Sequence, residues 1–391
     1  GVCAASGATG AGGDRHGHPP PLGLPPTRAP QSRKEDDVRI SDLDTPALIC
    51  DLDILERNIA TYQQLISDAG LALRPHIKTH KVPAIAHMQL AAGASGICCQ
   101  KVTEAEVFVA AGIKDVLISY NIIGQPKLER LSRLARQADV TVAVDSAYAA
   151  RGISAQAAAD SVEVGVVIEL AMGNRSGVAT PQDAVELGRL VTALPGVRLR
   201  GLMGYPTGPD PECLDFFEAT ITAYRAEGLC VEMVSGGGTA TAWQAAAQKP
   251  IGFTEHRVGT YIYHDCMQVQ RSPHITLDDC ALRVICTVVS RPTPDIATID
   301  GGSKTFTNEG LGGEAKAHHI IEYPEARTIK QNEEHGVIDA SACPRKPEIG
   351  ERITVIPYHA CVTANLHDTV VGVRGDTVEV IWPILARGRV H

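Results

Sequence analysis

The chain has 391 residues, of which 44% are hydrophobic and 21% charged, and its formal net charge is −9. The composition is ordinary for a globular protein, and the negative charge argues against nucleic acid or an anionic membrane as the main partner. Because no apolar run approaches the roughly 18 to 20 residues that cross a bilayer, the sequence predicts a soluble protein.

The opening segment, residues 1–38, differs in composition from the rest of the chain. It is rich in Gly, Ala and Pro and has no apolar periodicity, so we expect it to be disordered. It is either a plain tail or the remnant of an organelle-targeting leader. The 11 cysteines are scattered without a CxxC pair, which favours reduced thiols inside a cell, in the cytoplasm or in an organelle.

Apolar, β-branched segments alternate with helical patterns over residues 53–278. Such segments are typical of parallel strands buried on both faces. Eight of them joined by helices predict a (β/α)8 TIM barrel, whereas a doubly wound open sheet, the alternative, usually has fewer strands. The candidate strands are 71–77, 94–100, 115–120, 140–146, 162–171, 197–205, 231–238 and 256–263, and the helices include 103–111, 125–137, 181–194 and 215–227.

A different pattern fills residues 279–391. Short apolar segments are divided there by Gly, Pro, Asp and Asn turns, with no convincing helix among them. This pattern predicts an antiparallel β domain after the barrel. Residues 39–52, which precede the barrel, are predicted to supply that domain with one more strand.

The sequence LRPHIKTHK at residues 73–81 places two His, two Lys and one Arg just beyond a predicted barrel strand. Side chains at the C-terminal ends of barrel strands form the active site in this architecture. A lysine in a partly apolar barrel mouth can lose its charge and act as an amine nucleophile. A solvated basic loop is the alternative interpretation of the same residues.

Two further motifs carry candidate chemistry. Residues Ser235 to Thr239 read Ser-Gly-Gly-Gly-Thr after an apolar strand, where backbone N–H groups can approach a phosphate, although a tight structural turn would look the same. His359 and Cys361 lie two residues apart, so on a predicted strand they would face the same side. Imidazole and thiolate together suit a Zn²⁺ ion, and buried packing is the alternative.

The motifs RPHIKTHK, GICCQKVTEAEVF, VSGGGT, EEHGVI and PYHACVTANLHD occur in this order, and together they resemble the D-threonine aldolase / D-serine dehydratase family. The similarity covers residues 40–391. It implies an alanine-racemase-like, fold type III arrangement, in which a barrel that binds pyridoxal 5′-phosphate precedes a β domain.

The resemblance also implies roles for individual residues. Lys78, and not Lys81, would form the Schiff base with the cofactor and act in catalysis. His359 and Cys361 would hold a divalent metal (Zn, Mn or Mg), with His359 also catalytic. The other implied cofactor contacts are Ser235, Gly236, Gly237, Gly238 and Thr239 around the phosphate, Arg175 near the phenolic oxygen, Tyr205 near the pyridine ring, Tyr261 near the phosphate, and Gln100 at a strand end.

The implied activity is that of a lyase that cleaves β-hydroxy D-amino acids, D-threonine above all, to glycine and an aldehyde. The alternative is a D-serine or 3-hydroxy-D-aspartate dehydratase, favoured by the His359-Ala360-Cys361 arrangement and by the lack of a histidine after Tyr205. The motifs CCQKVTEAE, EEHGV and the closing NLHDTVVGVRGDTVEVIWPILARGR favour the aldolase. An amino-acid racemase would not need the metal ligands, and non-catalytic carriers of pyridoxal phosphate lack the β domain. A homodimer is also expected from the resemblance.

Overall fold

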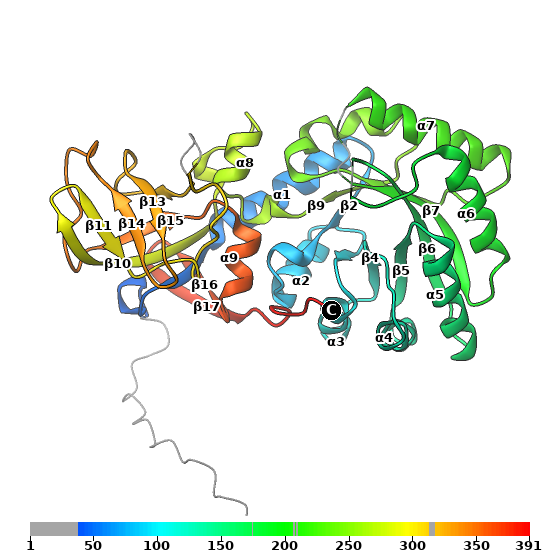
Figure 1. The fold of residues 1–391 in the computed structure, drawn as a ribbon, viewed down its shortest axis with the longest axis horizontal. Helices are drawn as coiled ribbons and strands as arrows, with labels where there is room; N and C mark the ends of the chain where they lie inside the picture. The colour runs from blue at the N-terminus through cyan, green and yellow to red at the C-terminus, as the bar shows by residue number, and fades with distance from the viewer. Residues whose placement is uncertain (1–37, 174, 206–207, 209, 313–316) are drawn as a thin grey trace, which may run out of the picture. The chain divides into compact units, whose positions relative to one another are not determined.

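A computed structural model describes residues 38–173, 175–205, 208, 210–312 and 317–391. Its larger part is built around a sheet of eight parallel strands (Figure 1). Val38–His391 form one unit. The predicted disordered head, residues 1–38, lies outside the described residues apart from Val38. Among the described residues, no helix combines the length and the apolarity needed to cross a membrane.

The predicted (β/α)8 barrel is confirmed. Its strands follow the order β2-β9-β8-β7-β6-β5-β4-β3, and a parallel bridge between His76 and Cys98 links β2 to β3, so the sheet nearly closes on itself. An open doubly wound sheet would leave these two ends apart. The strands are β2 (Ala72–Pro75), β3 (Ile97–Cys99), β4 (Asp115–Ile118), β5 (Asp139–Val144), β6 (Val164–Leu170), β7 (Val197–Gly204), β8 (Met233–Gly236) and β9 (Glu255–Val258).

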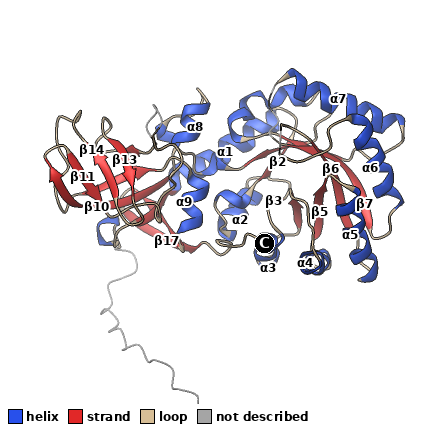
Figure 2. Ribbon diagram, in the orientation of Figure 1, coloured by secondary structure: helices blue, strands red, loops and turns tan. Residues whose placement is uncertain are grey.

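Helices alternate with the barrel strands and cover the outside of the sheet (Figure 2). Local signals fix where they start: the Ser146 and Thr180 side chains accept hydrogen bonds from backbone N–H groups three residues on, and Pro181 occupies the first turn after Thr180. The helices of this part are α1 (Leu52–Asp68), α2 (Pro83–Ala91), α3 (Val102–Ala110), α4 (Gln125–Ala135), α5 (Ala147–Ala159), α6 (Pro181–Ala193), α7 (Pro211–Ala226) and α8 (Cys266–Arg271).

A second, nine-stranded sheet contains the C-terminal part of the chain and one early strand. The early strand, β1 (Ala47–Asp51), pairs with β10 in antiparallel and with β16 in parallel orientation. It therefore lies inside this sheet and not in the barrel. The other strands are β10 (Leu282–Thr293), β11 (Ile296–Ile299), β12 (His319–Ile320), β13 (Arg327–Gln331), β14 (Gly336–Asp339), β15 (Arg352–Ile356), β16 (Thr369–Arg374) and β17 (Thr377–Pro383).

One expectation for the C-terminal part is wrong. The segment around His359 and Cys361 was predicted to continue as a strand, with no helix in the domain, but β15 ends at Ile356 and helix α9 (Ala360–Leu366) follows. His359 is the residue before the helix, and Cys361 lies in its first turn. His359 and Cys361 are therefore brought close together by the first turn of a helix, and not by lying on the same face of a strand.

Several histidines are buried and neutral in the fold, which leads to a prediction for stability. Burial lowers the pKa of His80 to about 3 and that of His256, His264 and His318 to about 4, from an ordinary value of 6.5. Between about pH 6.5 and pH 4 the unfolded chain binds protons that the folded chain does not, so stability decreases as the pH falls through this range.

The free energy of unfolding is therefore expected to fall between pH 7 and pH 5, with each such histidine contributing up to ~1.4 kcal/mol per pH unit inside its window. Burial also raises the pKa of two carboxyl groups, that of Asp265 to about 6 and that of Glu104 above its ordinary value, which acts in the opposite sense, but the four histidines outnumber them. Urea unfolding at pH 7, 6 and 5 measures the effect. An unfolding free energy that stays constant over this range would contradict it.

Candidate active site

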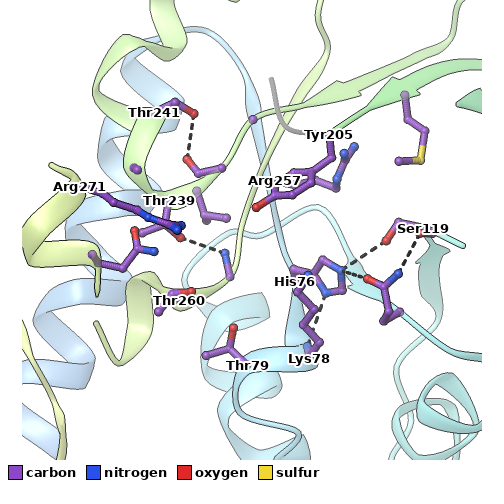
Figure 3. Close-up of a pocket in the computed structure, with 18 of the residues that line it drawn as sticks. His76, Lys78, Thr79, Ser119, Tyr205, Thr239, Thr241, Arg257, Thr260 and Arg271 are labelled. Carbon is purple, nitrogen blue, oxygen red and sulfur yellow. Dashed lines mark hydrogen bonds between the residues drawn. The ribbon is translucent and has the colours of Figure 1, made fainter. Parts of the chain in front are cut away.

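A cavity opens at the carboxyl ends of the barrel strands, where loops following the strands meet helix α8 (Figure 3). Barrel enzymes carry their active sites at this end of the sheet. None of the described residues that line the cavity has a carboxylate, so the surroundings favour an anionic ligand. Four lining residues are cationic: Lys78, Arg175, Arg257 and Arg271.

The two lysines of the RPHIKTHK motif point to different places. Lys78 lies in the short 3-10 helix η3 (Ile77–Thr79), and its half-buried side chain lines the cavity. Lys81 is buried elsewhere, with its Nζ 2.7 Å from Asn365 Oδ1 and 3.9 Å from Glu104 Oε1. Of the two amines, only that of Lys78 is placed to react with a ligand in the cavity.

Tyr205 and Arg175 join Lys78 at this cavity. The Tyr205 ring centroid lies 5.7 Å from Lys78 Nζ and 5.1 Å from the guanidinium carbon of Arg175. Arg175 also lies 3.5 Å from the Glu169 carboxylate, which keeps it near the end of β6. The structure thus brings three of the predicted site residues together as an aromatic ring with two cations beside it.

His76 is a cavity residue that the sequence analysis did not single out. Its Nε2 lies 3.1 Å from Gln100 Oε1 and 3.3 Å from Ser119 Oγ. Burial, together with the charges of Lys78 and Arg257, holds the pKa of His76 well below its usual range. The imidazole is therefore neutral, and Nε2 donates to the Gln100 amide oxygen. Gln100, which also lines the cavity, holds this ring in place.

The glycine turn after β8 forms another wall of the cavity. Gly237 has φ +94°, and a Cβ on it would lie 2.4 Å from the His256 ring, so only glycine fits there. Gly238, Thr239 and Thr241 follow along the cavity into the 3-10 helix η4 (Thr239–Gln248), and Gly259 N donates to Thr239 Oγ1 at 3.3 Å. This close backbone approach suits a phosphate group.

Ser235 and Gly236 differ from the other predicted phosphate contacts. Both are strand residues of β8, and neither lines the cavity. The buried Ser235 hydroxyl instead donates to the Glu255 carboxylate and accepts from the Arg257 guanidinium. Arg257, which sequence reasoning missed inside an apolar strand, also donates to Gly204 O at 2.7 Å and reaches the cavity floor. Ser235 therefore orients a cavity cation and does not itself form the cradle.

Tyr261 was predicted near the phosphate, but its side chain is not among those that line the cavity. The ring is fully buried against Tyr62, with centroids 4.9 Å apart, and its hydroxyl accepts from Gln89 Nε2 at 2.9 Å. Its neighbours Gly259 and Thr260 face the cavity instead. The cavity wall after β9 is therefore formed by Gly259 and Thr260 and not by Tyr261.

The predicted metal ligands lie directly behind the cavity wall. Cys361 Sγ is 3.2 Å from Thr79 Oγ1 and 3.7 Å from Thr260 Oγ1, and both threonines line the cavity. His359 is within hydrogen-bonding distance of Cys361. Burial opposes ionisation of both groups, yet their mutual interaction raises the pKa of His359 to about 9 and lowers the pKa of the Cys361 thiol.

One buried carboxylate connects the start of helix α9 to helix α8 at the cavity. Asp265 accepts from Gln268 N at the start of α8 through Oδ1 and from Ala360 N at the start of α9 through Oδ2, each at 2.8 Å. Gln268 on α8 lines the cavity, and Arg271 extends towards it from the same helix (Figure 3). Within the described ranges, no group of three or more His, Cys, Asp or Glu side chains is arranged to hold a metal ion.

A pair of glycine substitutions tests the turn after β8. Gly237→Ala introduces a Cβ at φ +94° and within 2.4 Å of the His256 ring, so we expect destabilisation of at least about 1–2 kcal/mol and weaker binding of pyridoxal phosphate. In Gly238→Ala the nearest contacts of the new Cβ are 3.7 Å away and φ is −176°, so the unfolding free energy should barely change. Equal unfolding midpoints in urea for the two variants would contradict this account of the turn.

Two family models match the chain. Residues 50–266 match the N-terminal domain of alanine racemase, and residues 281–373 match a putative serine dehydratase domain. A D-threonine aldolase from Arthrobacter sp. is 35% identical over 381 residues, which is 94% of this chain and 97% of the relative. The solved D-threonine aldolase of Filomicrobium marinum superposes with a TM-score of 0.83 at 37% identity, covering 91% of this chain and 99% of that one.

A third similar protein is the D-threo-3-hydroxyaspartate dehydratase of Delftia sp., with a TM-score of 0.78 and 29% identity over 89% of this chain and 99% of that one. It has also been solved with a histidine, or a cysteine two positions further on, replaced by alanine, the cysteine variant in a metal-free form. Both family models, in this order, account for the barrel and the sheet. The chain belongs to the D-threonine aldolase / D-serine dehydratase family, whose fold is of the alanine racemase type.

Proposed function

We propose that the protein is a pyridoxal-phosphate-dependent lyase that cleaves β-hydroxy D-amino acids, D-threonine among them, to glycine and an aldehyde. The observation that carries the proposal is a single cavity in which the Lys78 amine faces the glycine turn after β8, with His359 and Cys361 behind the Thr79 wall. The aldolase relatives, which match almost the whole chain, support the choice of reaction.

The cavity fits pyridoxal phosphate by its own chemistry. The turn at Gly237 excludes any side chain and offers backbone close to the cavity, as a phosphate requires. Lys78 can hold the aldehyde covalently, and the Tyr205 ring and Arg175 stand beside it. When bound, the cofactor supplies an electron sink at the substrate Cα. The cationic lining then also serves to hold the substrate carboxylate.

Lys78 is the proton acceptor that the cavity offers. None of the described lining residues carries a carboxylate. His76, the other candidate base, directs Nε2 to Gln100 and Nδ1 towards the backbone N–H of Lys78, so it positions the lysine and does not move a proton. The Lys78 amine, free once the substrate amine has taken its place, is therefore assigned both proton transfers of the cleavage: it accepts the β-hydroxyl proton as the Cα–Cβ bond breaks, and it then delivers a proton to Cα. The thiolate of Cys361 and the imidazole of His359 would bind the β-hydroxyl side of the substrate.

A divalent metal on His359 and Cys361 is part of the proposal. The two side chains offer a nitrogen and a sulfur donor close together, which suits Zn²⁺, and two protein ligands leave positions for water or substrate. When bound, such an ion supplies a Lewis acid. The homodimer expected from the sequence stays a prediction.

A dehydratase that eliminates water from the same substrates is the second candidate function. The histidine and the cysteine replaced in the Delftia sp. enzyme are two positions apart, as are His359 and Cys361 here, and its cysteine variant was solved metal-free. This shared spacing specifically favours dehydration.

Product identification separates the two reactions. Incubation with D-threonine and D-serine in the presence of pyridoxal phosphate and Zn²⁺ should give glycine plus acetaldehyde from D-threonine. Formation of 2-oxobutyrate from D-threonine, or of pyruvate from D-serine, would select the dehydratase instead. Activity that is unaffected by a chelator, with only interconversion of D and L isomers, would contradict both candidate functions.

A further inference from the structure

The imidazole of His359 has a carboxylate partner that neither the sequence motifs nor the proposed chemistry assigns. His359 Nδ1 lies 2.7 Å from Glu309 Oε2. Glu309 belongs to the loop after β11 and is distant in sequence from the HAC segment. Its side chain is 51% exposed, whereas that of His359 is 22% exposed, so the carboxylate caps the outer side of the ring.

The loop that carries Glu309 is built to reach this position. Glu309 N donates to Thr307 Oγ1 at 3.0 Å, which closes a local turn. Gly310 has φ +80°, and a Cβ on it would lie 2.9 Å from the ring of Tyr358, the residue before His359. A glycine is therefore needed for the loop to lie against the Tyr358–His359 segment, and this close approach brings the carboxylate over the imidazole.

The hydrogen bond between Glu309 and His359 Nδ1 determines which ring nitrogen can bind a metal ion. Since a carboxylate accepts hydrogen bonds, Nδ1 must carry the proton, and the lone pair of the neutral ring is then on Nε2. Metal-binding histidines commonly donate their second N–H to a carboxylate, which fixes the ring and raises its basicity. Cys361, with its Sγ against Thr79 and Thr260, lies on the cavity side of the same segment.

We propose that Glu309 is a positioning residue that fixes the tautomer and orientation of His359, so that Nε2 and the Cys361 thiolate together bind a divalent cation. The inference rests on the metal site of the proposed function and adds a residue to it. Glu309 itself is not among the described residues that line the cavity.

The affinity of the cofactor-loaded, metal-stripped enzyme for Zn²⁺, measured by competition with a chromophoric chelator, tests the proposal without relying on turnover. Glu309→Ala should weaken Zn²⁺ binding by about 10- to 100-fold. Glu309→Gln, which keeps an acceptor for Nδ1–H but loses the charge, should fall between this variant and the wild type. Because Glu309 is half exposed, both variants should unfold at the wild-type temperature.

Glu334→Ala is the matched control. It removes a carboxylate of similar exposure from the same domain, one that pairs with Lys304 at 2.8 Å, and should leave Zn²⁺ affinity unchanged. Wild-type affinity in Glu309→Ala, or equal losses in Glu309→Ala and Glu334→Ala, would overturn the proposal. Zn²⁺ binding that is unaffected by His359→Ala would instead overturn the metal site itself, so the two failures are distinguishable.

Discussion

Lys78→Ala should abolish the visible absorbance of protein-bound pyridoxal phosphate and lower turnover by on the order of 10³-fold or more, because the variant loses both the covalent attachment point and the proton acceptor. The nearby buried Glu104 keeps Lys81 as an ion-pair partner at 3.9 Å, so the removal of the half-buried Lys78 side chain does not leave that carboxylate without a cation. Absorbance spectra of the purified variant and product formation from D-threonine measure the two effects.

Lys101→Ala is the control for this substitution. Lys101 lies next to Gln100 with its Nζ 3.5 Å from the Tyr120 ring centroid, but it does not line the cavity. It should retain the absorbance band and most of the activity. Borohydride reduction followed by peptide mass spectrometry should place the label on Lys78, and a label on Lys81 would refute the assignment.

His359→Ala should leave the cofactor bound but reduce turnover by at least about 10²-fold, since one of the two proposed metal ligands is lost. The fold should tolerate the change, because His359 precedes α9 without making a side-chain capping bond. Zn²⁺ content, cofactor absorbance and turnover measured on the same sample separate a metal defect from a cofactor defect.

His335→Ala provides the comparison for this variant. His335 belongs to the EEHGVI motif, yet it is exposed in the turn between β13 and β14 and does not line the cavity. Its replacement should leave metal content and turnover unchanged. Full turnover of His359→Ala in metal-free buffer would show that the reaction does not depend on this residue.

The barrel was predictable because its strands are short, apolar and separated by amphipathic helices, a pattern set by burial on both faces. Helix α9 was not predictable from ACVTANL, since its short, partly β-branched sequence has no strong helix signal of its own. A tertiary contact stabilises the start of this helix, because the Asp265 carboxylate, 95 residues earlier in the chain, accepts a hydrogen bond from Ala360 N.

The candidate site shows the same contrast: residues placed by one local loop could be predicted, whereas residues placed by distant partners could not. Lys78, Gly237 and Thr239 lie where short motifs indicated, because each motif is one loop at a strand end. Ser235 belongs to the same motif as Gly237 and Thr239, and Tyr261 follows the barrel strand β9. Their side chains instead contact Glu255 and Tyr62, partners that no local pattern reveals. Arg257 was missed for a related reason. Its contacts with Ser235 and Gly204 and its place at the cavity follow from the closing of the barrel and not from the sequence of its own strand.

The place of β1 in the second sheet has a consequence for how the protein is made. Ile49 pairs with Arg283 on one side and Val371 on the other, so its neighbours leave the ribosome long after it does. One edge of β1 stays open until β10 has been made and the other until β16 has been made, so the sheet can close only when translation is nearly finished. If the chain were divided after the barrel and the two halves were expressed separately, β1 would stay with the barrel half. The C-terminal sheet would then lack the strand that lies between β10 and β16.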